Sequence, residues 1–435
     1  MSLADAPAAF EHVGRLAALP WVHAAFHWFH LHERRLMHWQ RELVSIAAPP
    51  FGERARAEWL AARFAELGLA QVEIDAVGNV SGLLCGRRRA GDLAGKMAGD
   101  LAEDRRCVML SAHIDTVFPA GEPIDPVLER GERRLVAPGA CDNGAGVTAL
   151  LALAAALQSC AGEPAGNILF VGNVGEEGDG DLRGARYLFG ASRWRESIAA
   201  NLVLDGAGCD TVVTEALGSR RFLVSILGPG GHSWTDAGAP NPIVAASRAI
   251  SALSEVELPC EPRTTLNFGV IEGGTSINSI PESASVRIDL RSVDAGQLVR
   301  LEAELRRNVD AAIVAANAQA ERRANGRRLR GLLRHTIRQI GSRPAGRLPA
   351  EAPLLQSLLA VDRRLGIRTQ ERIASTDANI PLSLCIPALS LGAGGEGGGI
   401  HTRGEWYDSS GRELALKRIL LLLLAAADHL SGSRH

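Results

Sequence analysis

Apolar residues are distributed along the chain in two kinds of pattern. Short apolar runs bounded by turn residues predict buried strands, and longer stretches with apolar residues at helical spacing predict helices. The predicted strands outside the central part of the chain are Gln71–Ala76, Val80–Cys85, Cys107–Leu110, Asn167–Val174, Leu202–Leu204 and Pro387–Leu391. The predicted helices are 10–47, Glu53–Leu67, the apolar stretch that ends at Leu157, Leu354–Leu365 and Ile419–Ala427. This alternation predicts an α/β fold with a mixed sheet flanked by helices.

The pattern changes at Arg220, where strand-like and helix-like stretches follow in the order βαββαβ. The expected strands are Phe222–Leu227, Thr264–Ile271, Ser283–Leu290 and Leu332–Ile340, with helices at Asn241–Ser254 and around Leu301–Ile313. That order is typical of a ferredoxin-like domain. We therefore predict a larger domain in two parts, residues 1–216 and 344–435, with a smaller domain inserted over 217–343. The 435 residues allow this, because single cores stop growing near ~250–300 residues.

Three predicted strands are followed by polar groups at their carboxyl ends. These groups are His113 with Asp115, Glu176 with Glu177, and Asp205. Open α/β sheets build their sites at the carboxyl ends of strands, so we expect these side chains to lie close together. If the strand continues past Leu110, His113 and Asp115 point to the same side, and the carboxylate could orient the imidazole as it does in many metal sites.

Two glycine-rich loops add groups of the same kind. Asp142 precedes an apolar helix in a stretch that matches neither common phosphate-binding pattern, and His401 follows the last predicted strand. The whole set contains two imidazoles and several carboxylates, which suits divalent ions such as Zn²⁺, Mn²⁺ or Co²⁺. One carboxylate could bridge two ions ~3.5–4 Å apart.

The predicted N-terminal helical segment is rich in histidine. His23 and His27 are four residues apart and could share a helix face, as some zinc-binding histidines do. The glutamate of the H-E-x-x-H pattern is replaced by Ala24, and Trp28 and Phe29 follow. We therefore interpret the segment as aromatic packing and not as a metal site.

Composition narrows the possible partners. The chain has 47 Lys and Arg against 49 Asp and Glu, a net charge of −2, so no chain-wide charge favours nucleic acid or an anionic membrane. Seven cysteines without a C-x-x-C pair favour a reduced, cytoplasmic setting. We expect no secretion signal, and the longest apolar run is shorter than the ~18–20 residues that span a bilayer. The charged, glycine-rich stretch Gly86–Arg106 is expected to form an exposed or disordered loop.

Taken together, the motifs resemble the M20 family of metallopeptidases and amidohydrolases. The resemblance rests on HIDT, PGACDNGAG, GEEGDGDLRGARYL, LDG, GPGGHSW, GGTSINSIP and the closing His loop, which occur in the family order over essentially the whole chain. Within the family the chain is most similar to the peptidase T-like branch of aminopeptidases. The resemblance implies a dinuclear metal-dependent hydrolase of short peptides, with the inserted domain serving as lid and as dimerisation domain of a homodimer.

The resemblance also implies the metal ligands. His113 and Asp205 would hold one divalent ion, Glu177 and His401 would hold the other, and Asp142 would bridge the two. Zn²⁺ is the first candidate for both ions, with Mn²⁺ and Co²⁺ as alternatives.

The same resemblance implies the catalytic and substrate-binding residues. Glu176 would be the general base that activates water and returns the proton to the leaving amine, and Asp115 would orient His113. His232 would be the lid histidine that stabilises the oxyanion, either in its own subunit or across the dimer. Asn278 and Arg291 would hold the substrate, although Arg291 could equally form a structural ion pair at a strand end.

Two positions depart from the common family pattern or vary within it. Asn143 and Gly144 follow the bridging position, where the family often has Asp-Asp or Asp-x-Lys, and in relatives the peptide after the bridging residue is often cis. Asp205 stands where other members carry Glu, and Asp at this place tends to accompany aminopeptidases and dipeptidases.

Three functional hypotheses follow. The first is an aminopeptidase acting on short peptides. The second is an amidohydrolase that removes an acyl group from an amino acid with the same catalytic residues. The third, from a different class, is a metal-binding protein without catalytic activity, against which the complete set of Glu176, His232 and ligand positions argues.

Overall fold

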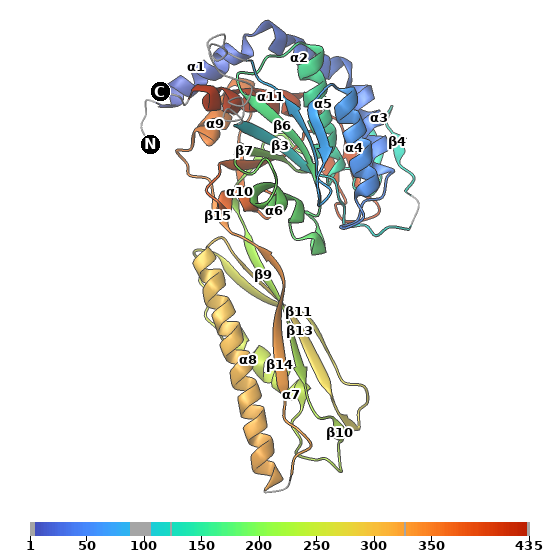
Figure 1. Ribbon diagram of the computed structural model, residues 1–435, viewed down its shortest axis with the longest axis vertical. Helices are drawn as coiled ribbons and strands as arrows, with labels where there is room; N and C mark the ends of the chain where they lie inside the picture. The colour runs from blue at the N-terminus through green and yellow to red at the C-terminus, as the bar shows by residue number, and fades with distance from the viewer. Residues whose placement is uncertain (1–4, 88–105, 122–123, 326–327, 433–435) are drawn as a thin grey trace. The chain divides into compact units, whose positions relative to one another are not determined.

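The computed structural model describes residues 5–87, 106–121, 124–325 and 328–432 (Figure 1). The expected loop at Gly86–Arg106 lies largely outside these residues. The chain divides into two compact units. Unit 1 comprises residues 1–216 and 347–435, and unit 2 comprises residues 217–346. Each unit is described by itself below.

A nine-stranded mixed sheet forms the centre of unit 1. Its strand order is β1-β2-β6-β3-β7-β17-β8-β15, and β16 pairs with β8. The central strands β6, β3, β7 and β17 run parallel to their neighbours in this group. The strands are β1 (Ala70–Ile74), β2 (Val80–Leu84), β3 (Cys107–His113), β6 (Asn167–Asn173), β7 (Ile198–Leu204), β8 (Thr211–Ala216), β15 (Gly346–Arg347), β16 (Gln370–Ala374) and β17 (Ala388–Leu391).

Helices cover both faces of this sheet, which confirms the predicted α/β class. In β3, Val108 and Leu110 face one core and Cys107 and Met109 face another, as expected for a strand buried on both sides. The first core includes α5 and α11, and the second includes α6 (Figure 1). The helices are α1 (Asp5–Ala17), α2 (Pro20–Leu31), α3 (Glu33–Val44), α4 (Arg54–Glu66), α5 (Gly144–Ser159), α6 (Arg183–Gly190), α9 (Pro353–Leu365), α10 (Asn379–Ser383) and α11 (Arg412–Gly432), with a short 3₁₀ turn at Gly178–Gly180.

Several elements of unit 1 were not predicted from the sequence. They include β8, β16, α6 and a small antiparallel sheet in the order β18-β19-β5-β4. The strands of this small sheet are β4 (Val127–Glu129), β5 (Arg134–Val136), β18 (Glu396–Gly398) and β19 (Trp406–Asp408). Because β18 pairs with β19 and β19 pairs with β5, the small sheet joins the C-terminal loop that carries His401 to the segment that precedes Asp142.

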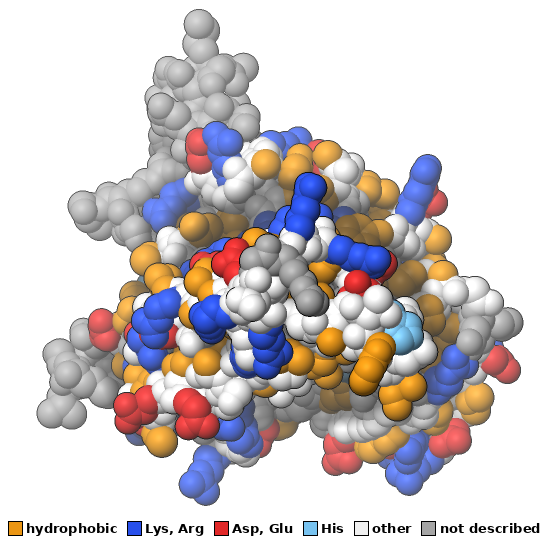
Figure 2. Space-filling model, turned by 90° about the horizontal axis from the view of Figure 1, so that it is seen from below, with side chains coloured by type: hydrophobic (Ala, Val, Ile, Leu, Met, Phe, Trp, Pro, Cys, Tyr) orange, Lys and Arg blue, Asp and Glu red, His pale blue; other side chains and the backbone are white. Residues whose placement is uncertain are grey.

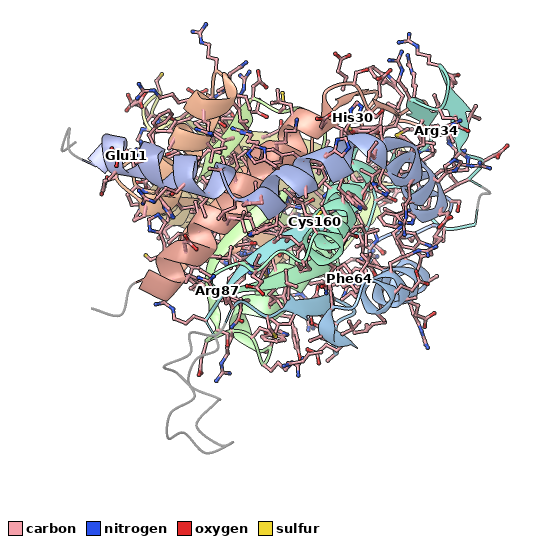
Figure 3. The ribbon with its side chains drawn as sticks, turned by 90° about the horizontal axis from the view of Figure 1, so that it is seen from above. Glu11, His30, Arg34, Phe64, Arg87 and Cys160 are labelled. Atoms are coloured by element: carbon pink, nitrogen blue, oxygen red, sulfur yellow. The ribbon has the colours of Figure 1, made fainter. Side chains whose placement is uncertain are left out.

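The histidine-rich N-terminal segment forms three packed helices. Helix α1 packs on α9 and α11, and α2 packs on α5 and α11 (Figure 3). Trp28 and Phe29 are buried, whereas His23 and His27 are exposed on the same helix. Among the described residues, the groups that could hold a metal ion all lie elsewhere. The burial of Trp28 and Phe29 agrees with the interpretation of this segment as aromatic packing.

Unit 2 has a four-stranded antiparallel sheet in the order β11-β13-β9-β14. Alternate residues of its strands, such as Phe222 and Val224 of β9, pack against α7 and α8 on one face. The chain order β9-α7-β11-β13-α8-β14 is the predicted βαββαβ order. The elements are β9 (Gly218–Leu227), β10 (Gly231–His232), α7 (Pro242–Ser254), β11 (Thr264–Gly273), β12 (Ser279–Ile280), β13 (Ser283–Ser292), α8 (Ala295–Ala324) and β14 (Arg334–Arg343).

The described part of the chain contains no helix that is long and apolar enough to cross a bilayer. On the face shown in Figure 2, basic side chains are interspersed with acidic, apolar and uncharged ones. This distribution agrees with the nearly balanced net charge of the chain.

The buried ion pair between Arg418 and Asp362 should be a main determinant of the stability of unit 1. Arg418 Nε and Nη2 each donate to one Asp362 oxygen at 2.7 Å, and both side chains are buried between α9 and α11. Asp362→Asn leaves the guanidinium charge without its partner, so we expect a loss of about 3–5 kcal/mol in the free energy of unfolding. Denaturant unfolding measures this loss. Glu58→Gln, which breaks the exposed pair with Arg54, is the control and should leave the midpoint unchanged.

Candidate metal centre

The sheet of unit 1 brings three strand ends to one edge. In the parallel pairing of β3 with β6, His113 lies opposite Asn173, and β7 lies on the other side of β3. His113 is the last residue of β3, Glu176 and Glu177 follow β6, and Asp205 follows β7. These side chains therefore come together because the strands end at the same edge, and at most a few residues separate each side chain from its strand.

Two loops complete the site. Asp142 precedes Asn143, the N-cap residue of α5, whose side chain accepts a hydrogen bond from the Gly146 N–H at 3.0 Å. The peptide between Asp142 and Asn143 is cis. His401 lies in the loop between β18 and β19 with a positive φ of 63°.

Asp142 is central among the five predicted ligands. Its Oδ1 lies 3.1 Å from His113 Nε2, and its Oδ2 lies 3.1 Å from His401 Nε2. Asp205 Oδ1 lies 3.8 Å from His113 Nε2, and Glu177 Oε1 lies 2.9 Å from His401 Nε2. Each oxygen of one carboxylate thus faces a different imidazole, and each imidazole faces a second carboxylate.

The charges of the site favour bound cations. Burial acts to lower the pKa of His113, but hydrogen bonds with Asp115, Asp142 and Asp205 outweigh it and hold that pKa above its usual range. The hydrogen bond with Asp142 is the main reason that the pKa of His401 is raised to about 9. For Glu177, burial is the main reason that the pKa is raised. Both histidines therefore lie in a negative field, which a divalent cation would neutralise.

The described residues fit a metal centre. Three overlapping groups offer ligand atoms within 4.8 Å of one another: His113 with Asp142 and Asp205, Asp142 with Glu177 and His401, and His113 with Glu176 and Glu177. The first two groups share Asp142. Imidazole nitrogens and carboxylate oxygens are ligands that Zn²⁺, Mn²⁺ and Co²⁺ accept.

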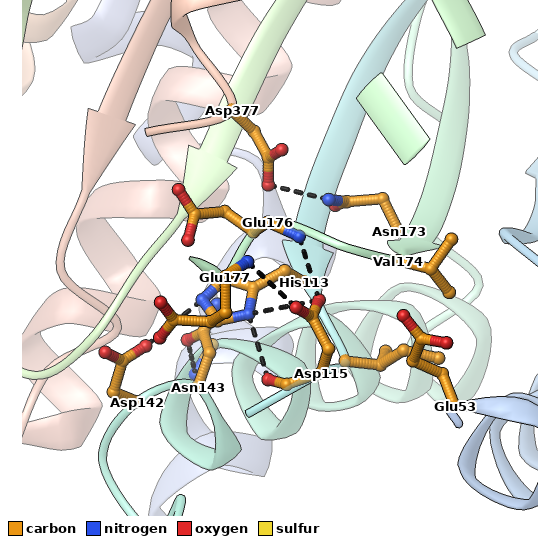
Figure 4. Close-up of polar contacts among 12 residues, drawn as sticks. Glu53, His113, Asp115, Asp142, Asn143, Asn173, Val174, Glu176, Glu177 and Asp377 are labelled. Carbon is orange, nitrogen blue, oxygen red and sulfur yellow. Dashed lines mark hydrogen bonds and ion pairs between the residues drawn. The ribbon is translucent and has the colours of Figure 1, made fainter. Parts of the chain in front are cut away.

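Asp115 is fully buried and has more partners than the sequence suggested. Its two oxygens accept hydrogen bonds from the backbone N–H groups of Glu176 at 3.1 Å and Glu177 at 2.9 Å (Figure 4). His113 Nδ1 lies 3.1 Å from the backbone carbonyl oxygen of Asp115 and 3.7 Å from its carboxylate. Asp115 therefore connects the histidine of β3 to the glutamates that follow β6.

Glu176 is buried at the edge of the group formed around His113 (Figure 4). Asn173, the last residue of β6, donates from Nδ2 to Asp377 Oδ2 at 2.6 Å. Burial is the main reason that the pKa of Asp377 is raised to about 6. Sequence reasoning missed Asp377 because it follows no predicted strand and its partner is 204 residues away.

Glu405 is the second residue that sequence reasoning missed. It is fully buried and accepts hydrogen bonds from backbone N–H groups of the loop that carries Asp142. The only available signal was its position four residues after His401 in a stretch that we interpreted as a glycine-rich loop.

The other three predicted residues lie in unit 2. His232 is exposed in β10, where it pairs with Ser279 of β12, and the backbone N–H of Ser233 donates to the carbonyl oxygen of Asn278 at 3.0 Å. His232 and Asn278 are thus close neighbours. Arg291 lies on β13, where its Nε donates to Asp289 at 2.6 Å.

Comparison with known proteins identifies the family. A model of peptidase family M20/M25/M40 matches residues 109–427. The chain belongs to this family. It is therefore a hydrolase, and the M20 resemblance of its motifs is confirmed. Membership in this family also counts against the hypothesis of a metal-binding protein without catalytic activity.

One relative of this M20 chain is a desuccinylase. Over 234 residues the chain is 33% identical to the succinyl-diaminopimelate desuccinylase of a Methylobacterium species, an alignment that covers 49% of this chain and 57% of that enzyme. The chain thus spans little more than half the length of this curated relative.

Solved structures share the fold of the M20 chain. The Bacillus cereus aminopeptidase PepT has a TM-score of 0.69 at 20% identity and matches 90% of this chain and 98% of its own. The Bacillus subtilis YXEP protein, described as a dinuclear metal-binding peptidase of the M20 family, has a TM-score of 0.64 at 18% identity and matches 91% and 98%. At these identities the likeness establishes the fold alone.

Removing the shared carboxylate should reduce metal binding. Asp142→Ala deletes the oxygens that face both His113 and His401, so we expect fewer than two bound ions per chain. Elemental analysis after dialysis against Zn²⁺ or Co²⁺ measures the stoichiometry. Glu215→Ala on β8 is the control and should behave as the unaltered protein does. Two full equivalents in Asp142→Ala would contradict a bridging role.

Proposed function

We propose that this M20 hydrolase is a dinuclear metal-dependent aminopeptidase that cleaves amide bonds of short peptides. The observation that carries the proposal is the position of Asp142, whose two oxygens each lie 3.1 Å from a different histidine. A carboxylate in that position can bridge two ions, which is the arrangement that clamps attacking and departing oxygens in hydrolysis. The fold likeness to the aminopeptidase PepT and to a dinuclear peptidase supports the proposal.

The five ligands divide into two overlapping sets. His113 and Asp205 would hold one ion, Glu177 and His401 would hold the other, and Asp142 would be shared. Zn²⁺ is the first candidate, and Mn²⁺ and Co²⁺ are the alternatives. Two bound divalent ions would polarise the scissile carbonyl and lower the pKa of water toward ~7.

Glu176 would act as the general base. It belongs to neither of the two sets that share Asp142, and it lies beside His113 and Glu177. Its carboxylate would take the proton of the attacking water and deliver it to the leaving amine. Asp115 would support this role. Its carboxylate accepts a hydrogen bond from the backbone N–H of Glu176 and lies 3.7 Å from His113 Nδ1.

Residues of unit 2 would complete the reaction. His232 would stabilise the oxyanion that develops on the scissile carbonyl, and Asn278 and Arg291 would hold the substrate. We also propose a homodimer formed through unit 2 and a cytoplasmic location. All seven cysteines are free, which agrees with a reducing compartment.

An amidohydrolase that removes acyl groups from amino acids is the second candidate. The 33% identity to a desuccinylase favours it. Asp205, in the place where deacylases of the family tend to carry Glu, favours the aminopeptidase. Both reactions would use the same ligands and the same base.

Glu176→Gln should separate catalysis from metal binding. The amide cannot accept a proton at neutral pH, so we expect the rate of hydrolysis to fall by about 10²- to 10⁴-fold while the metal content stays unchanged. Steady-state rates and elemental analysis of the same preparation test this. Asp179→Asn removes an exposed carboxylate from the same loop and should have no effect. Full activity in Glu176→Gln would show that Glu176 is not the base.

A substrate panel should distinguish the two candidate functions. We expect the enzyme reconstituted with Zn²⁺, Mn²⁺ or Co²⁺ to cleave tripeptides with a free amino group and to leave N-acetyl and N-succinyl amino acids intact. Release of amino acids from both sets, measured side by side by chromatography, provides the test. Cleavage of the acylated set alone would replace the aminopeptidase proposal with the amidohydrolase.

A further inference from the structure

The loop that carries Asp142 is held by one buried carboxylate. Glu405 is 0% exposed. Its Oε1 accepts hydrogen bonds from the N–H groups of Cys141 at 2.8 Å and Asp142 at 2.7 Å, and its Oε2 accepts one from Gly139 at 3.0 Å. Three backbone donors from four consecutive residues thus converge on a single side chain.

Glu405 also belongs to the loop that presents His401. The two residues are four apart, and the N–H of Glu405 donates to the carbonyl oxygen of Thr402 at 3.1 Å within the same turn. The carbonyl oxygen of Glu405 accepts a hydrogen bond from Ala137 at 3.0 Å, just before the Asp142 loop. The main chain and the side chain of Glu405 therefore both connect the His401 loop to the Asp142 loop.

We propose that Glu405 is a positioning residue for the metal centre. It sets the distance between Asp142 and His401, and it places a buried negative charge behind the shared carboxylate. The inference rests on the proposed dinuclear site, because it concerns the affinity of that site for its ions.

The hydrogen bonds require a carboxylate at this position. A carboxylate accepts at both oxygens and donates nothing, so it can satisfy all three N–H groups. A glutamine can accept at one oxygen only, and its NH₂ group would then face the N–H of Gly139 or those of Cys141 and Asp142. An uncompensated buried donor is costly, so the loop would shift to relieve the contact.

The charge adds to this effect. Glu405 accepts a hydrogen bond from the N–H of Asp142 itself, and Asp205 and Glu177 each offer an oxygen within 4.8 Å of an oxygen of Asp142. Several carboxylates close together repel one another unless a cation lies between them, so each added negative charge favours divalent ions. A neutral side chain at position 405 should therefore weaken metal binding even where the loop keeps its conformation.

A second group holds the same loop without adding charge. Gln40 of α3 donates from Nε2 to the carbonyl oxygen of Ala140 at 2.6 Å. This hydrogen bond, and the one from Ala137 to the carbonyl oxygen of residue 405, do not depend on the side chain at position 405.

Cobalt binding tests the proposal without recourse to activity. In isothermal titration with Co²⁺, the unaltered protein should bind two ions, and Glu405→Gln should bind at least one of them about 10- to 100-fold more weakly, the range found when groups that orient metal ligands are removed. The visible absorption of the bound Co²⁺ should also change, because it reports ligand geometry. Glu405→Asp keeps the charge but shortens the side chain, and its affinity should lie between the other two.

Asp362→Asn is the matched control. It neutralises another buried carboxylate, one that holds Arg418 between α9 and α11, so it should lower stability and leave both Co²⁺ affinities and the spectrum unchanged. Affinity and spectrum in Glu405→Gln equal to those of the unaltered protein would overturn the inference. An equal loss of Co²⁺ in Asp362→Asn would also overturn it, because the loss would then follow from stability alone. Fewer than two Co²⁺ in the unaltered protein would refute the dinuclear site itself.

Discussion

The parallel register of three strands is the constraint on which the site depends. His113 of β3 is level with Asn173 of β6, and Ser111 is level with Val203 of β7. Because the strands end level, the residues that follow them meet at one edge. A shift of β3 by a single residue would turn His113 toward the opposite face of the sheet and would also exchange its two buried sides. The pairing register that places the residues of β3 in their two cores therefore places the histidine as well.

The carboxylates of the site have two different roles. Asp142, Glu177 and Asp205 present their oxygens to histidines, where cations can bind. Asp115 and Glu405 instead accept hydrogen bonds from backbone N–H groups, and so hold the segments on which those ligands lie. Backbone donors neutralise a buried carboxylate without adding a competing positive charge. The negative charge of the site therefore remains available to bind metal ions.

The pattern of apolar and polar residues predicted the large elements and the polar groups at the strand ends, because an apolar run and the residue that follows it are adjacent in the sequence. The small sheet was not predicted, since strands of three residues such as β4 carry too little periodicity and form only by pairing. Glu405 was missed for a similar reason: its partner Cys141 is 264 residues away, and a single sequence contains no trace of that contact. Substrate choice could not be predicted either, because it depends on the side chains around the bound substrate and not on the apolar pattern that forms the sheet.

The sheet order has a consequence for biosynthesis. Strand β17 lies between β7 and β8, although more than 170 residues separate it from both in the sequence, counting from Thr211–Ala216 to Ala388–Leu391. During synthesis, all of unit 2 emerges from the ribosome before β17 does, and the central sheet cannot be completed until this late strand arrives. His401 and Glu405 emerge later still. A nascent chain would thus lack part of the proposed metal centre until these residues have been made, so the order of synthesis itself would delay activity until then.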